Sequence, residues 1–159
     1  MNEPQALENQ TATEVASLMI PIAGGLLLLP TVTVAEMVPF KYPERSDDMP
    51  DWYLGNFSWR DQMIPLVSFE GLNGEAVPDY SGTCRIAVLN NTGVDERLPF
   101  LGLATQGIPR LSRVKSDEIH QTEDAELKAF DLMSVYHAGE SVIIPNTTAI
   151  EEAIIKLAG

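Results

Sequence analysis

The chain has 159 residues, with 23 acidic and 10 basic side chains and a formal net charge of −13. A surface this acidic is repelled by phosphate backbones and anionic headgroups, which argues against binding to nucleic acid or to the membrane surface. The single cysteine, Cys84, excludes an intrachain disulfide, and its apolar surroundings predict a small buried hydrophobe rather than a reactive thiol. The length suits one compact domain or two small lobes that share a core.

Residues 1–13 are polar and predict a disordered tail, so we place the folded domain at 14–159. The run VASLMIPIAGGLLLLPTV at 15–32 is apolar, but Glu residues and no cations precede it, unlike a signal peptide. Two prolines and two glycines interrupt it, which disfavours a spanning helix. We therefore predict a hairpin of strands 14–22 and 25–30 around Gly24–Gly25.

The next segment, 31–38, is predicted to form one or two helical turns, capped by Thr31 or Thr33 and ended by Pro39. In a helix, Val34, Met37 and Val38 would share one face while Glu36 points elsewhere. A polar loop over 39–51 follows.

Two apolar runs, Leu54–Trp59 and Met63–Phe69, then predict a second hairpin with Arg60 at its tip. Arginine beside Trp59 and Phe57 is typical of residues that dominate interfaces, which makes Arg60 a candidate contact residue. The alternative is a solvated turn arginine that keeps the hairpin from pairing with other strands.

The remainder predicts more short strands and a closing helix. Turn signals separate the strands, and the spacing favours small antiparallel barrels, with two linked barrels compatible. The expected segments are strands 84–89, 98–105, 108–114, 129–135 and 141–144, and a helix over 148–157, for eight or nine strands in all.

The sequence contains no recognisable set of catalytic residues. His120 and His137 have no metal-site spacing, and no phosphate-binding loop or nucleophile motif occurs. Acidic pairs such as Asp47–Asp48 fall in polar loops, where carboxylates stay solvated. We therefore predict no enzyme activity, cofactor or metal. The cluster Arg110, Arg113 and Lys115 is either a solvated strand face or a patch for an acidic partner.

The order of these segments along the chain also indicates a protein family. LLLLP at 26–30 precedes Val34–Ala35–Glu36–Met37, and a proline-containing loop leads to GNFSWRDQMIPLVSF at 55–69, with Gly55, Arg60 and Pro65 in register. This order resembles the CheW-like family, the coupling proteins of bacterial chemosensory arrays, over about residues 14–157. The chain is a divergent member by this resemblance, similar to pilus-type accessory adaptors such as ChpC. Asp61, Ser58 and Ser68 stand where the family pattern has glycine, asparagine and aspartate.

The resemblance implies a mainly β fold of two intertwined five-stranded SH3-like barrels, with short helices after the first hairpin and at the C-terminus. It implies a non-enzymatic cytoplasmic adaptor at the receptor array. Such an adaptor couples the cytoplasmic tips of chemoreceptors (methyl-accepting proteins) to the regulatory domain of a CheA-type histidine kinase, with type IV pilus twitching as one output.

The same resemblance places Val34, Glu36 and Arg60 on the receptor-facing surface, with Met37 and Gly55 nearby to shape it. Val34 and Met37 have the alternative of being core residues, and Asp61 could pair with Arg60 or repel an acidic partner. Two readings of function remain beside coupling: a generic barrel-type interaction module, or a competitor that occupies the array without activating the kinase.

Overall fold

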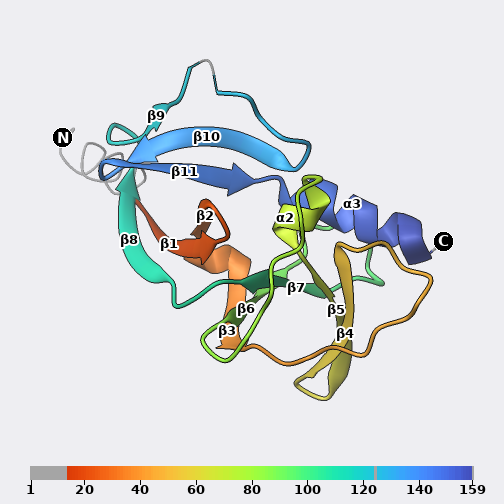
Figure 1. The fold of residues 1–159 in the computed structure, drawn as a ribbon. Helices are drawn as coiled ribbons and strands as arrows, with labels where there is room; N and C mark the ends of the chain where they lie inside the picture. Colours follow the sequence, from red (N-terminus) through yellow and green to blue (C-terminus); the bar gives the residue numbers. More distant parts are fainter. Residues whose placement is uncertain (1–13, 124, 159) are drawn as a thin grey trace.

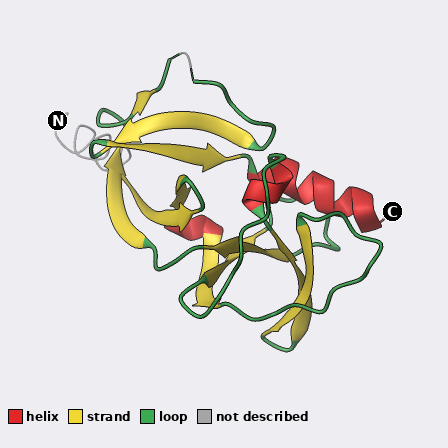
Figure 2. Cartoon of the chain, viewed as in Figure 1, coloured by secondary structure: helices red, strands yellow, loops and turns green. Residues whose placement is uncertain are grey.

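The computed structural model describes residues 14–123 and 125–158, so the tail predicted for 1–13 lies outside the described residues. Strands dominate this part of the chain, as Figure 2 shows. They form a six-stranded sheet in the order β8-β1-β2-β11-β10-β9 and a five-stranded sheet in the order β3-β6-β7-β5-β4. Figure 1 shows the two sheets as separate curled units joined by several crossings of the chain.

The six-stranded sheet is built from both ends of the chain. Its first hairpin, β1–β2, precedes the five-stranded sheet in sequence, and its other four strands follow that sheet. Strand β2 pairs with β11 in parallel through Leu27 and Ile143. The other strand pairs in this sheet are antiparallel. Its strands are β1 (Glu14–Ile22), β2 (Gly25–Pro30), β8 (Arg110–Lys115), β9 (His120–Gln121), β10 (Asp131–His137) and β11 (Glu140–Pro145).

The five-stranded sheet takes the middle of the chain, and its one parallel pair joins β5 to β7. Helices are short apart from the last one. The strands are β3 (Val34–Pro39), β4 (Tyr53–Trp59), β5 (Gln62–Val67), β6 (Arg85–Asn90) and β7 (Phe100–Thr105), and the helices are η1 (Thr31–Thr33), α2 (Phe69–Leu72) and α3 (Thr147–Ala158).

Three apolar clusters fill the fold. One lies within the six-stranded sheet and includes Met19 and Val135, and one lies within the five-stranded sheet and includes Phe57 and Ile86. The largest joins the two sheets to both α-helices. Its buried members are Ile20, Leu27, Leu29, Tyr53, Val67, Phe69, Leu72, Ala87, Leu89, Leu98, Leu101, Leu103, Ile150 and Ile154.

The prediction for 31–38 is wrong beyond its first three residues. Helix is confined to the 3-10 turn Thr31–Thr33, and Val34–Pro39 is the edge strand β3, paired with β6. Within β3, the β-branched residues Val34 and Val38 favour a strand over a helix, and pairing with β6 supplies backbone hydrogen bonds to the extended segment.

Other expectations are confirmed or adjusted. The hairpin 14–22 and 25–30 is observed as β1 and β2, the closing helix as α3, and Cys84 is buried. The described residues contain eleven strands rather than eight or nine, in sheets of six and five. The second strand of the second hairpin was predicted to reach Phe69, but β5 ends at Val67. The Ser68 side chain accepts a hydrogen bond from the Gly71 N–H and so caps α2, a helix that was not predicted from the sequence.

A buried carboxylate links the two sheets. Glu70, in α2 after the five-stranded sheet's β5, accepts a 2.8 Å hydrogen bond from the Ala23 N–H in the β1–β2 turn. Its other oxygen lies 3.4 Å from both the Ser68 and the Tyr80 hydroxyl oxygens. A buried carboxylate is tolerated because several donors satisfy it.

We expect Glu70→Ala to lower the free energy of unfolding by about 2 kcal/mol, because the Ala23 N–H and the Tyr80 hydroxyl lose a charged acceptor. Urea denaturation measures the change. Glu75→Ala is the matched control: Glu75 is half exposed and pairs with Lys128 Nζ at 2.9 Å, so its removal is expected to cost under about 1 kcal/mol. Equal losses for the two variants would contradict the structural role assigned to Glu70.

Candidate protein-binding site

The tip of the β4–β5 hairpin is a two-residue turn, Arg60–Asp61, between the paired residues Trp59 and Gln62. Both turn residues have positive φ, 47° for Arg60 and 63° for Asp61. Two-residue hairpins favour this backbone because it matches the twist of the strands, but it normally recruits Asn-Gly or Asp-Gly. The flanking strand pairs therefore hold arginine in a conformation that costs free energy and fixes the direction of its side chain.

Glu36 organises the side chains around this tip. Its Oε1 accepts hydrogen bonds from Trp59 Nε1 at 3.0 Å and from Arg60 Nη2 at 3.1 Å. The guanidinium carbon of Arg60 also lies 4.6 Å from the centre of the Trp59 ring, a cation–π arrangement. The Arg60 side chain is 65% exposed and that of Glu36 is 42% exposed, so the ion pair faces solvent. An exposed ion pair contributes little to stability, but here it orients the arginine.

Trp59 anchors this arrangement to the core. Its ring is buried and packs edge to face against Phe100 at 4.8 Å between ring centres. Glu36 is on β3 and Trp59 on β4, the two edge strands of the five-stranded sheet. The Glu36–Trp59 hydrogen bond therefore joins the two edges of that sheet and helps close it into a barrel.

A β-bulge explains how β3 presents Glu36. The register of β3 against β6 shifts between Val34 and Glu36. Bulges of this kind redirect side chains, and here Val34 and Met37 both pack, partly buried, against the cluster shared by the sheets. The structure therefore favours a core role for these two residues, while Glu36 and Arg60 are brought together.

Gly55 has a structural role below the tip. It is buried, its φ is +134°, and an added Cβ would collide with the backbone carbonyl of Glu44. The next residue, Asn56, exchanges two backbone hydrogen bonds with Glu44, of 2.8 and 2.9 Å. Glycine is required here so that the 43–44 segment can lie against β4.

Three features of this site were not predicted from the sequence. Trp59 was identified only as an apolar neighbour of Arg60, and Asp61 rather than Glu36 was considered as the intramolecular partner of the arginine. Phe100 was not identified at all. Since 23 residues separate Glu36 from Trp59, no local pattern could reveal their contact, and only a correct strand assignment for 34–39 would have placed them near each other.

The other candidate residues lie outside this site. His120 is exposed on β9, and buried His137 has its Nε2 2.7 Å from Ser112 Oγ. Across residues 14–123 and 125–158, no group of His, Cys, Asp and Glu has the arrangement of a metal site. Arg110 and Arg113 on β8 pair with Glu140 at 2.6 Å and Glu14 at 3.3 Å, which favours a solvated strand face.

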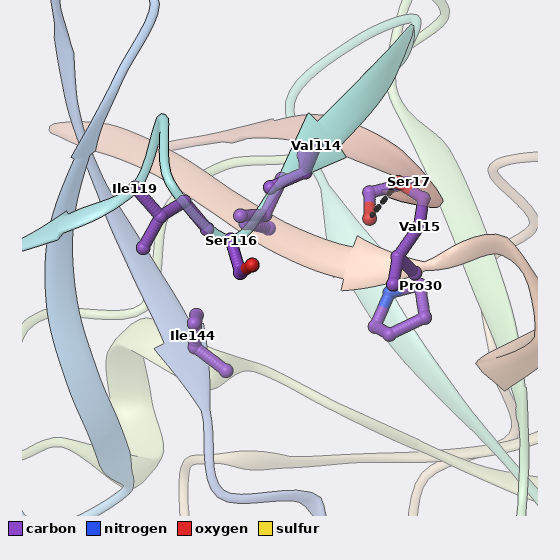
Figure 3. A pocket seen from close by; sticks show the side chains of 8 residues that line it. Val15, Ser17, Pro30, Val114, Ser116, Ile119 and Ile144 are labelled. Carbon is purple, nitrogen blue, oxygen red and sulfur yellow. Dashed lines mark hydrogen bonds between the residues drawn. The ribbon is translucent and has the colours of Figure 1, made fainter. Parts of the chain in front are cut away.

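A pocket of about 320 Å³ lies between β1, β2, β8 and β11. Figure 3 shows Val15, Ser17 and Pro30 on one side of it and Ile144 and Ile119 across from them. Among the described residues that line it, two serine hydroxyls are the only polar side-chain groups, and none is titratable. The pocket can accept an apolar group, but it offers no acid or base for catalysis.

Comparisons with known proteins agree with this architecture. A family model described as "CheW-like domain" matches residues 16–153. The curated proteins give no significant match. Among solved structures, the crystal structure of the scaffolding protein TtCheW from Thermoanaerobacter tengcongensis matches with a TM-score of 0.69 and 17% identity, over 82% of this chain and 83% of that chain. The match confirms the expected fold of two SH3-like units. No helix of the described residues is long and apolar enough to span a membrane.

The strained tip predicts an order of stability among variants of Asp61. Glycine relieves the cost of positive φ, so Asp61→Gly is expected to raise the free energy of unfolding by about 0.5 kcal/mol. Alanine tolerates this backbone less well than aspartate, so Asp61→Ala is expected to lower it by a similar amount. Chemical denaturation of the three proteins gives the order, and a more stable alanine than glycine variant would show that φ strain is not the determinant.

Proposed function

This chain belongs to the CheW-like domain family, and on that premise we propose that it is a non-enzymatic adaptor in bacterial chemosensory signalling. It couples the cytoplasmic tips of chemoreceptors to the regulatory domain of a CheA-type histidine kinase, in the cytoplasm at the receptor array. By its likeness to pilus-type members, we extend the proposal to arrays that control type IV pilus twitching.

The oriented Arg60 carries this proposal. Trp59 and Glu36 hold its guanidinium in place, while Nε and Nη1 have no protein partner among the described residues. A preoriented arginine loses less conformational freedom on binding than a free one, and arginine beside tryptophan is typical of interface hot spots. Its donors match a carboxylate or carbonyl oxygen on a receptor tip.

Glu36 has a positioning role in this scheme. One of its oxygens already accepts from both Trp59 and Arg60, while no described residue donates to its other oxygen, which could accept from a donor on the partner. Arg60 and Glu36 therefore present a donor and an acceptor side by side. Val34 and Met37 support the surface from below, and Gly55 lets the loop before β4 lie flat against the hairpin.

A second reading is a competitor that occupies the array without activating the kinase. Asp61 favours this reading, because it adds a carboxylate beside Arg60 where the family pattern has glycine, and that charge weakens contacts to an acidic receptor residue. Kinase activity in a reconstituted receptor–kinase complex distinguishes the two: a coupling protein restores receptor control, and a competitor lowers activity in the presence of a functional coupling protein.

We expect Arg60→Ala to weaken binding to the receptor tip by more than about 1 kcal/mol, or about fivefold, while binding to the kinase regulatory domain is kept. Titration calorimetry with the two purified partners from the same organism measures both. Arg110→Ala is the matched control, because Arg110 is also an exposed, ion-paired arginine but lies on β8 of the other sheet. A wild-type protein that binds neither partner would refute the coupling function.

A further inference from the structure

A groove lined by aromatic rings does not have Arg60 or Asp61 among its described lining residues. It has a volume of about 530 Å³ and runs between the segment after β3 and the segment before β6, around Phe40, Tyr42, Pro78 and Tyr80. The Phe40 ring is stacked on that of Tyr80 with 5.3 Å between centres, and Tyr42 meets Phe40 edge to face at 5.4 Å. Tyr42 is 82% exposed, an unusual position for a large ring that already has two ordered contacts.

The groove is preformed by hydrogen bonds from its floor to the core. The Tyr42 hydroxyl donates to the carbonyl oxygen of Tyr80 at 3.3 Å, and the Phe40 N–H donates to the carbonyl of Cys84 at 3.2 Å. The buried Tyr80 ring is held by a hydrogen bond that its hydroxyl donates to Ser68 Oγ at 3.1 Å inside the domain. Burial also raises the pKa of Tyr80 above its ordinary value, so the hydroxyl stays neutral. A ligand would therefore meet rings that need little reordering.

The charges around the groove are mainly negative. Residues 40–51 and 77–81 carry five carboxylates and two cations, and one of the cations, Arg45, lies 3.7 Å from Asp51. Two charged side chains line the groove itself: Asp79, beside Pro78, and Arg45, which is paired with Asp51 outside the lining. With a net charge of −13 on the whole chain, this surface attracts a basic partner and repels an acidic one.

We propose that this groove binds an extended, proline-containing segment of a partner protein, with lysine or arginine next to its prolines. Proline-rich segments adopt an extended left-handed helix before binding, and they dock on grooves lined by exposed aromatic rings. The exposed ring of Tyr42 offers a face for a proline or for a guanidinium, and Asp79 offers a carboxylate to the basic residue. This binding is independent of the contacts proposed for Arg60.

The test is a selection from a displayed library of random short peptides against the whole protein, followed by titration of one selected synthetic peptide. We expect the selected sequences to share prolines with an adjacent lysine or arginine. We expect Tyr42→Ala to lower the affinity for the selected peptide by about tenfold. We expect Asp79→Asn to lower this affinity less and to reduce its dependence on salt concentration. Tyr136→Ala on β10 is the matched control, since Tyr136 is an exposed tyrosine of the other sheet and its loss is expected to leave affinity unchanged.

Thermal unfolding of the three variants separates binding from folding. Tyr42 is exposed, so its variant is expected to keep the wild-type melting temperature within a few degrees. The proposal is overturned if no peptide is enriched, if the enriched peptides lack proline, or if they bind wild type and Tyr42→Ala equally well.

Discussion

The shared apolar cluster between the two sheets is the constraint on which the rest of this fold depends. Ile20 and Leu27 reach it from the six-stranded sheet, Leu101 and Leu103 from the five-stranded sheet, and Ile150 from α3. Each sheet also encloses a cluster of its own, but those are smaller, and neither sheet could cover its second face alone. Burial of this shared surface fixes how the two units face each other, and so fixes where the β4–β5 hairpin projects.

The hairpin tip shows how a weak interaction gains importance from its place in the fold. The Glu36–Arg60 pair is exposed, and pairs of that kind contribute little to stability. Yet the same carboxylate accepts a hydrogen bond from the buried Trp59, and this bond links β3 to β4, the two edge strands of the five-stranded sheet. The residue that orients the arginine is thus also one that closes the barrel, so the shape of the proposed binding surface and the closure of the sheet are coupled.

Local chemistry made much of this fold predictable. Gly24–Gly25 between apolar runs identifies the first hairpin, and the apolar face of 148–157 identifies α3. The helix predicted for 31–38 was wrong for most of the segment because its apolar spacing fits a helix as well as a strand. The pairing with β6 that makes 34–39 a strand involves residues some fifty positions later in the chain. For the candidate site, the family resemblance predicts Glu36 and Arg60. Their contact, the anchoring by Trp59 and the need for glycine at Gly55 arise from tertiary packing that no sequence spacing encodes.

The six-stranded sheet has a consequence for synthesis of the protein. Its hairpin β1–β2, with four consecutive leucines, leaves the ribosome well before β11, which pairs with β2 through Ile143 and lies more than 100 residues later. During that interval the edge of β2 and its apolar faces have no native partner, and exposed strands of this kind recruit other chains. The nascent chain is therefore expected to depend on chaperones, and conditions that slow its completion will favour aggregation over folding.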